Sequence, residues 1–272
     1  MLVNGGDREA LVGRDMRDHY QRLAGAYDDN WAYSPAFVGW MSGQIAEALS
    51  LTADDRIADI GCGTGLFAKR IASTLRPRHR MLCVDPAPAM LAQLGDDAER
   101  LLPLVASAED IAERKVSLPY DALDAMWLKE SVHHVKDPAR TLTGLAELLA
   151  PGGRLLVAML PTTIEYPLFA EALRRYEALQ PDPARIAEHL ADAGLRTTLG
   201  HVEHELRLDT ERYLAMVRAR YMSVLSTFSD AEIEAGIAEI RARHPGREVV
   251  FPDRFAFVLG VRDASVTGEG ES

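Results

Sequence analysis

The sequence has few cysteines, no long hydrophobic run and no excess of basic residues. Only Cys62 and Cys83 occur, which is typical of a reduced, cytoplasmic protein. No apolar run approaches the roughly 18 residues that a membrane-spanning helix needs, and the first residues lack the basic and apolar parts of a signal peptide. A net charge of -11 leaves no basic stripe for a phosphate backbone. We therefore expect a cytoplasmic protein that binds neither membrane nor nucleic acid.

The length of 272 residues, 47% of them hydrophobic, suits one sizeable core and is too short for two full α/β domains. We expect a helical lid over residues 1–50 and a core over residues 51–161. Inserted helices and the remaining strands should occupy residues 162–262, and the tail 263–272 is too polar to bury anything and should be disordered.

Short β-rich runs alternate with helical stretches from Arg56 onward, which predicts βαβ units and a sheet covered on both faces. The predicted strands span residues 56–60, 80–84, 102–106, 122–128, 154–160, 195–206 and 254–261. The predicted helices span residues 67–75, 139–149, 166–179, 183–193, 210–225 and 230–243, after two helices within residues 7–50 that break near Ser34. Pro151-Gly-Gly153 is expected to end the helix before the fifth strand.

A glycine loop follows the first predicted strand in Asp59-Ile-Gly-Cys-Gly-Thr-Gly65. Glycines there let the backbone turn sharply and bring amide groups close to a ligand. About twenty residues after Gly65, Asp85 ends the second predicted strand, where it can accept hydrogen bonds from both ribose hydroxyls. The alternative is an ordinary tight turn followed by a turn-forming Asp-Pro. NAD is a weaker candidate because its third glycine or alanine is replaced by Leu66.

Beyond these two features, Val105-Ala-Ser-Ala-Glu-Asp110, the segment from Asp124 to Val135 and Leu149-Ala-Pro-Gly-Gly-Arg-Leu155 follow in order. With them, residues 15–160 resemble the class I methyltransferases that use S-adenosylmethionine (SAM), in the small-molecule branch of quinone C-methyltransferases and natural-product enzymes. The resemblance implies a Rossmann-like, mostly parallel sheet with an antiparallel last strand. It also implies SAM as the cofactor and S-adenosylhomocysteine (SAH) as the product.

The resemblance also assigns the residues around the cofactor. Asp59 and the loop residues Gly61, Cys62, Gly63 and Gly65 would surround the methionine moiety. Asp85 would hold the ribose, and Pro86 and Met90 would face the adenine. The family commonly has Asp where this chain has Ser107, so the adenine amino group would be met by Ser107, by Glu109 or by Asp110, beside Ala108.

The segment from His19 to Asn30 is similar to the family's tyrosine-bearing lid helix. Tyr20 and Tyr27 lie two helical turns apart and so share a face. A phenol from this face could bond the methionine carboxylate while its ring covers the site. Ordinary amphipathic packing explains the same spacing equally well.

Candidates for chemistry follow the fourth predicted strand, because open α/β sheets present functional residues at the carboxyl ends of their strands. They are Lys129, Glu130, His133 and His134. On a helical turn Glu130 would face one of the histidines, and His133 could serve as a general base that Glu130 orients. Lys129 and His134 would line the cofactor, and a histidine that only lines the site is the competing interpretation.

Two absences narrow the chemistry. Met159 stands where related O-methyltransferases place an acidic partner, which leaves carbon and nitrogen acceptors open. The histidines lack a compact ligand spacing, so no metal site is expected.

The inserted helices should select the acceptor. Tyr166, Arg220 and Tyr221 lie on apolar helix faces, and Trp31 and Tyr33 are further lid candidates. Such residues suit an aromatic or carboxylate-bearing metabolite, although packing within the core is the alternative for most of them.

We therefore predict a methyltransferase of specialised or quinone-like metabolism that acts on a small molecule by direct transfer. One alternative is an enzyme of the same fold that uses SAM for intramolecular cyclisation of SAM itself or for a pericyclic step. A second is a non-catalytic SAM-binding module that meets a basic partner. The sequence leaves the acceptor open, and also whether the protein is a monomer or a homodimer.

Overall fold

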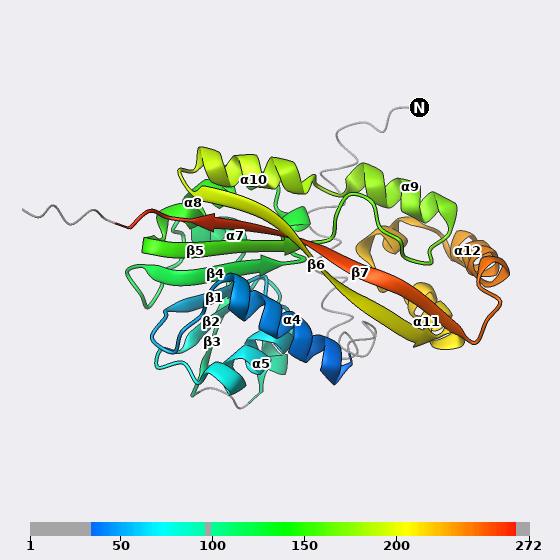
Figure 1. Ribbon diagram of the computed structural model, residues 1–272, viewed down its shortest axis with the longest axis horizontal. Coiled ribbons are helices and arrows are strands. Elements are labelled where there is room, and N and C mark those ends of the chain that lie inside the picture. Colours follow the sequence, from blue (N-terminus) through cyan, green and yellow to red (C-terminus); the bar gives the residue numbers. More distant parts are fainter. Residues whose placement is uncertain (1–33, 96–98, 265–272) are drawn as a thin grey trace, which may run out of the picture.

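Seven strands form one sheet in the order β3-β2-β1-β4-β5-β7-β6 within the described part of the chain (Figure 1). The computed structural model describes residues 34–95 and 99–264. The strands are β1 (Ile57–Ile60), β2 (Met81–Asp85), β3 (Leu101–Val105), β4 (Leu123–Lys129), β5 (Leu149–Met159), β6 (Arg196–Asp209) and β7 (Glu248–Val261). The first five run parallel, and β7 is antiparallel to both β5 and β6. The predicted fold class, a Rossmann-like sheet with an antiparallel last strand, is confirmed.

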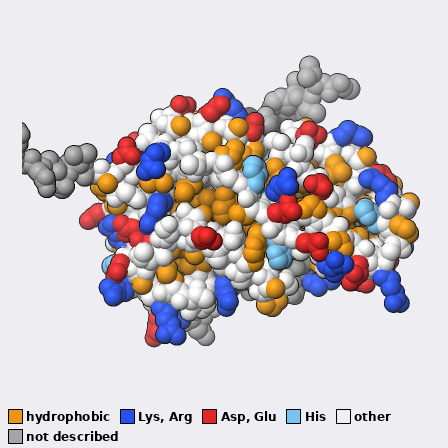
Figure 2. Space-filling model, in the orientation of Figure 1, with side chains coloured by type: hydrophobic (Ala, Val, Ile, Leu, Met, Phe, Trp, Pro, Cys, Tyr) orange, Lys and Arg blue, Asp and Glu red, His pale blue; other side chains and the backbone are white. Residues whose placement is uncertain are grey.

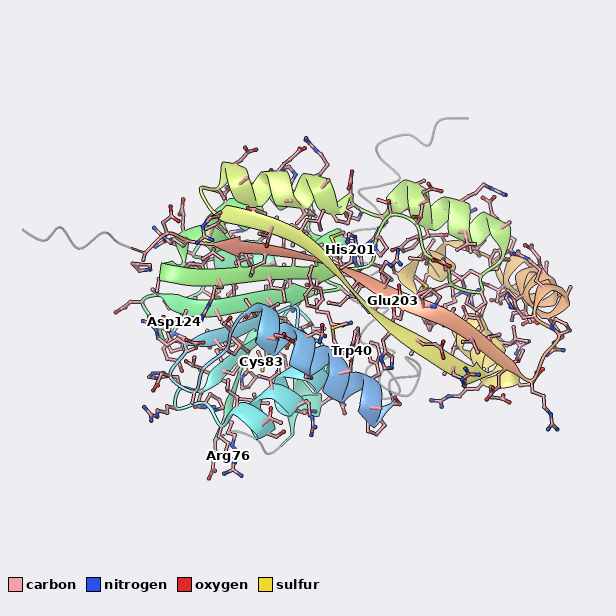
Figure 3. The ribbon with its side chains drawn as sticks, in the orientation of Figure 1. Trp40, Arg76, Cys83, Asp124, His201 and Glu203 are labelled. Carbon is pink, nitrogen blue, oxygen red and sulfur yellow. The ribbon has the colours of Figure 1, made fainter. Side chains whose placement is uncertain are left out.

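Parallel pairing brings the carboxyl ends of the central strands to one edge. Asp59 of β1 lies opposite Cys83 of β2 and Trp127 of β4, so these three strands end together. Asp124, at the start of β4, marks the opposite edge (Figure 3). Residues that follow β1, β2 and β4 therefore meet in space although they are far apart in the sequence.

Helices cover both faces of the sheet (Figure 1). On one face lie α4 (Pro35–Ala48) and α5 (Leu66–Leu75); on the other lie α7 (Ala108–Ala112), α8 (Pro138–Glu147) and α10 (Pro183–Asp192). Neighbouring strand residues alternate between the two layers: Trp127 packs in the α4 layer and Met126 in the α8 layer. This period of two is what a sheet with two buried faces requires.

Three of these helices begin at a proline that follows a capping side chain. Ser34, Asp137 and Asp182 each accept a hydrogen bond from an amide in the first turn of α4, α8 and α10. Proline at the first position costs no hydrogen bond, since that amide has no partner inside the helix. The local sequence thus fixes where each helix starts.

One end of the molecule is built on the long β6–β7 pair (Figure 1). Met159, at the end of β5, lies opposite Ala256 of β7, so residues 248–255 of β7 extend past β5 and pair with β6. Around this extension lie α9 (Ala170–Leu179), α11 (Thr210–Arg218), α12 (Asp230–Arg243) and the short η3 (Ser223–Thr227). Figure 2 shows hydrophobic side chains gathered over the middle of the sheet between α4 and α10. The carboxyl ends of the parallel strands thus point toward this extension (Figure 1).

Most predicted elements are confirmed, and several differ in extent. The predicted helix over residues 166–179 begins only at Ala170, because Phe169 keeps an extended backbone. The predicted helix over residues 210–225 ends at Arg218, and a short 3-10 helix follows as η3. Pro151-Gly-Gly153 does not separate α8 from β5. It lies inside β5, where Gly152 adopts a φ of 75° and the pairing with β4 shifts register.

No helix in the described ranges is long and apolar enough to cross a membrane.

The contact between α7 and α8 predicts how glycine substitutions affect stability. A Cβ on Gly144 of α8 would lie 2.5 Å from the Ala112 carbonyl oxygen, a backbone atom that cannot give way cheaply. We expect Gly144→Ala to lower the free energy of unfolding by about 1–3 kcal/mol in denaturant titrations. Gly43→Ala is the matched control, because Gly43 is exposed on α4 and its Cβ would meet nothing within 4 Å among the described residues. It should be neutral or stabilising by about 0.5–1 kcal/mol. Equal losses in both variants would contradict the packing argument.

Candidate functional site

The glycine loop between β1 and α5 is tied to the end of β2 by backbone hydrogen bonds. The amides of Gly61 and Cys62 both donate to the carbonyl of Val84, at 2.7 and 2.9 Å. The loop then closes on itself through the Gly65 amide, which donates to the Cys62 carbonyl at 2.9 Å. The loop is therefore a fixed turn whose position depends on β2.

Glycine is required in this loop for two separate reasons. Gly61, Gly63 and Gly65 have φ values of 76°, 56° and 71°, which side chains rarely tolerate. In addition, a Cβ on Gly61 would lie 2.5 Å from the Cβ of Ser131, and one on Gly65 would lie 2.1 Å from Leu94. A Cβ on Gly63 would meet no described atom within 4 Å. The loop is packed at both ends and open at its centre, as a cradle for a ligand must be.

Asp85 joins this loop to the start of the next one. Its Oδ2 accepts a hydrogen bond from the Gly63 amide at 2.9 Å, and its Oδ1 accepts one from the Ala87 amide at 2.8 Å. Burial raises the pKa of this carboxyl, and the two amide donors partly offset that rise. The following α6 (Pro88–Leu91) buries Met90 against Ala87, while Pro86 is half-buried. Asp85 is thus held at the open centre of the glycine loop.

Asp59, near the end of β1, and Cys62, within the loop, are the other two ionisable groups of this segment. Asp59 is buried, and its pKa is raised well above the ordinary value by that burial and then by the charge of Asp85, against the opposing effect of Lys129. The half-buried Cys62 thiol has a raised pKa, first because of a hydrogen bond with the thiol of Cys83. The Cys62 thiol is therefore protonated and lies against that of Cys83.

The residues expected around the adenine start α7. Ser107 and Asp110 form a capping box, in which the Asp110 amide donates to Ser107 Oγ at 3.1 Å and the Ser107 amide donates to Asp110 Oδ2 at 3.2 Å. Glu109 accepts a hydrogen bond from the Lys136 amide, and Ala108 is half-buried beside it. All three candidate polar side chains therefore already have protein partners.

Lys129 and Glu130 end β4 next to the glycine loop. The Lys129 ammonium lies 4.8 Å from the ring centre of Phe67 in α5 and 5.1 Å from that of Phe255 in β7. Burial lowers the pKa of Lys129, and the charges of Glu130, Asp253 and Asp59 oppose this. Lys129 thus lies between the glycine loop and β7.

Glu130 does not orient a histidine. It adopts a left-handed φ of 51°, and its Oε1 accepts a hydrogen bond from the Leu160 amide at 2.7 Å. The expected pairing of Glu130 with His133 or His134 assumed a helical turn, which the left-handed backbone at Glu130 prevents. Burial raises the pKa of Glu130.

His133 and His134 belong to η2 (Val132–His134), with ring centres 4.0 Å apart. Nδ1 of His133 is buried and has no hydrogen-bond partner among the described residues. Burial, and then the charge of Lys129, lower the pKa of His133 to about 4. The imidazole of His133 is therefore neutral at neutral pH.

The expected acceptor-side residues fall into two groups. Tyr166 donates its hydroxyl hydrogen bond to Asp253, and the Tyr221 hydroxyl lies 3.1 Å from that of Tyr213. Arg220, by contrast, donates to the Phe228 carbonyl and forms an ion pair with Asp230. The guanidinium therefore holds the segment between α11 and α12. Four expected residues, Tyr20, Tyr27, Trp31 and Tyr33, lie outside the described residues.

Asp253 was not among the residues expected in the site. It is 1% exposed and lies in β7, opposite His204 of β6. On α4, Trp40 turns toward this strand pair, with its ring centre 4.8 Å from that of His204 (Figure 3). An acidic residue inside an otherwise apolar stretch was the available signal.

Comparison with known proteins agrees with this geometry. Residues 58–155 match the family model described as a methyltransferase domain. Over these residues the chain is similar to methyltransferase domains. The match runs from β1 into β5 and therefore includes the glycine loop, Asp85 and the end of β4.

Three similar proteins illustrate the range of this domain. An uncharacterized methyltransferase of Mycobacterium tuberculosis is 31% identical over 52% of this chain and 52% of its own length. A ubiquinone biosynthesis O-methyltransferase of Xylella fastidiosa is 30% identical over 52% of this chain and 60% of its own. The chain thus spans about half to three fifths of these relatives.

Among solved structures, a putative methyltransferase from an antibiotic biosynthesis pathway of Anabaena variabilis shares the fold. It aligns with a TM-score of 0.62 and 17% identity over 81% of this chain and 96% of its own.

The contacts of Asp85 predict the effect of its substitution on SAM binding. Asp85→Asn should weaken SAM affinity by about 10- to 100-fold in isothermal titration calorimetry, because a charged ribose acceptor and the acceptor for the Gly63 amide are both changed. Asp182→Asn is the matched control. Asp182 also precedes Pro-Ala and accepts a hydrogen bond from the amide two residues later, but it caps α10. Unchanged affinity in Asp85→Asn, or an equal loss in Asp182→Asn, would contradict this assignment.

Proposed function

We propose that this protein transfers the methyl group of SAM to a small-molecule acceptor and releases SAH. The observation that carries the proposal is the glycine loop, packed at Gly61 and Gly65 and open at Gly63, with the Asp85 carboxylate held at its centre. SAM supplies an activated methyl group on a sulfonium, so the protein has to bind, align and exclude water.

The residues of the chain have distinct roles in this proposal. Asp85 holds the ribose, Pro86 and Met90 cover one face of the adenine, and the start of α7 from Ser107 to Glu109 borders its edge. The backbone of the glycine loop faces the methionine moiety above Asp59. Tyr20 and Tyr27 remain proposed lid residues, on the resemblance of their segment alone.

His133 is proposed to contact the acceptor. Its neutral imidazole presents a buried nitrogen without a hydrogen-bond partner in residues 34–95 and 99–264, which can bind an acceptor hydrogen. A pKa of about 4 makes His133 a weak base at neutral pH, so we propose that it orients the acceptor and does not remove a proton.

The acceptor is proposed to lie between the carboxyl edge of the sheet and the extension built on β6 and β7. Aromatic side chains of this extension, among them Tyr166 and Phe251, face one another there at 4.9 Å between ring centres. This environment suits a small aromatic or conjugated metabolite of specialised or quinone-like metabolism. The net charge of -11 supports a substrate other than nucleic acid.

Labelled SAM tests the reaction. The full chain incubated with methyl-labelled SAM and fractionated metabolite pools should place the label on a small molecule and form SAH in equal amount, as measured by mass spectrometry. Formation of methylthioadenosine, or conversion of a metabolite with SAM unchanged, would instead indicate cyclisation chemistry. A chain that binds SAM and converts nothing would be a binding module.

The position of His133 predicts a selective loss of activity. His133→Ala should lower kcat/KM for the acceptor by about tenfold, because an acceptor-orienting contact is lost, and should leave the Kd for SAM unchanged. His79→Ala is the control, since that histidine lies before β2 against Tyr120, at the other edge of the sheet. An unaltered rate in His133→Ala would contradict the proposal that His133 orients the acceptor.

A further inference from the structure

Asp253 lies where the extension meets the carboxyl edge of the sheet. Met159 ends β5 opposite Ala256, so Asp253 stands beyond the end of β5 on the same strand. It shares the packed layer of Phe255, whose ring contacts the Lys129 ammonium, and Lys129 in turn contacts Phe67 at the glycine loop. Lys129 thus lies between the layer that holds Asp253 and the helix that follows the glycine loop.

A buried carboxyl at this place has an ordered set of neighbours. The Tyr166 hydroxyl donates a hydrogen bond to Asp253 Oδ1. The titratable groups that surround it come from every adjoining element: Lys129 and Glu130 from β4 and its end, Tyr166 before α9, Tyr176 on α9, Tyr221 after α11 and His204 on β6. Tyr166 and Lys129 stabilise the charged carboxylate, whereas Glu130 opposes it.

We propose that Asp253 is the catalytic base, which accepts the proton of a hydroxyl or amine acceptor during methyl transfer. This inference rests on the proposed function and adds to it that the acceptor atom carries a dissociable proton. The acceptor oxygen or nitrogen attacks the methyl carbon, and the bond from carbon to sulfur breaks with its electron pair left on sulfur. The acceptor proton passes to the Asp253 carboxylate, which later returns it to water.

The other candidates are less suited to this role. His133 is too weak a base. Glu130 accepts from the Leu160 amide, a fixed backbone donor, whereas the donor to Asp253 is the Tyr166 hydroxyl, which can rotate when the carboxyl gains a proton. Burial raises the pKa of Asp253 to about 7, near the pH at which an enzyme operates. A base is most efficient when its pKa lies close to that pH.

The neighbours of Asp253 predict shifts of opposite sign. Tyr166→Phe removes a donor that favours the carboxylate, so the pKa of Asp253 should rise above its value in the unmodified chain. Glu130→Gln removes a negative charge and keeps an oxygen for the Leu160 amide, so the pKa of Asp253 should fall. Tyr120→Phe is the matched control, because its hydroxyl donates to the Arg80 carbonyl at a distant edge and should shift nothing.

Carbon-13 NMR of the full chain, with labelled aspartate carboxyls and saturating SAH, measures this pKa directly. The resonance missing from Asp253→Asn identifies the residue. We expect it to titrate near pH 7, to move upward in Tyr166→Phe and to move downward in Glu130→Gln. A titration at the ordinary carboxyl value of about 4, or no movement in either variant, would overturn the proposal.

The second test measures the rate of methyl transfer against pH, with the acceptor that the labelled-SAM experiment identifies. The rate in the unmodified chain should rise as Asp253 loses its proton, from low pH through about pH 7. Asp253→Asn should lose that rise and about 10²- to 10⁴-fold of the rate at pH 8, with SAM affinity retained. Methyl transfer with an unchanged pH profile in Asp253→Asn, or transfer to an atom without a dissociable proton, would refute the base while leaving the proposed function standing. Labelling of no acceptor at all would instead defeat the proposed function.

Discussion

The site depends on the hydrogen bonds that hold the glycine loop to the end of β2. The Val84 carbonyl accepts two loop amides, and the Asp85 carboxylate accepts the amide of Gly63. These bonds are made between residues about twenty positions apart, so they form only when β1 and β2 pair in their observed register. The shape of the glycine loop is therefore a consequence of the sheet.

Charge burial at the carboxyl edge is the second constraint. Asp59, Glu130 and Asp253 are carboxyls with raised pKa values, and burial lowers the pKa of Lys129 against the opposing effect of their charges. Burying such groups costs free energy that apolar residues of similar size would not. Their concentration at one edge, beside the glycine loop, supports the proposal that the chemistry occurs there.

Sequence patterns predicted the centre of the sheet well because β1, β2 and β4 are buried on both faces and form short apolar runs. The strands β1 to β4 begin and end within one or two residues of the predicted limits. Long-range effects were not predictable. The strand β7 starts at Glu248, well before the predicted residue 254, because Pro252 and Asp253 suggest a turn and yet pair with Glu205 and His204.

The glycine loop could be predicted from the local sequence, whereas the side-chain partners on the proposed acceptor side could not. Gly61 to Gly65 and Asp85 belong to one short segment with a regular spacing, so local physics predicts a tight turn there, and its role in holding the cofactor stays a prediction. The left-handed backbone of Glu130 and the partners of Arg220 come from tertiary packing, so spacing along a helix misplaced both side chains. The meeting of Lys129 with Asp253 joins residues more than a hundred positions apart, which no local pattern reveals.

We propose that SAM binds across the glycine loop with its ribose on Asp85. The most direct measurement is a crystal structure of the full chain with SAH. We predict that both ribose hydroxyls donate to the Asp85 carboxylate and that the methionine moiety lies over Gly63, with the sulfur on the side of Lys129. Density for SAH elsewhere, or a ribose turned away from Asp85, would contradict the account.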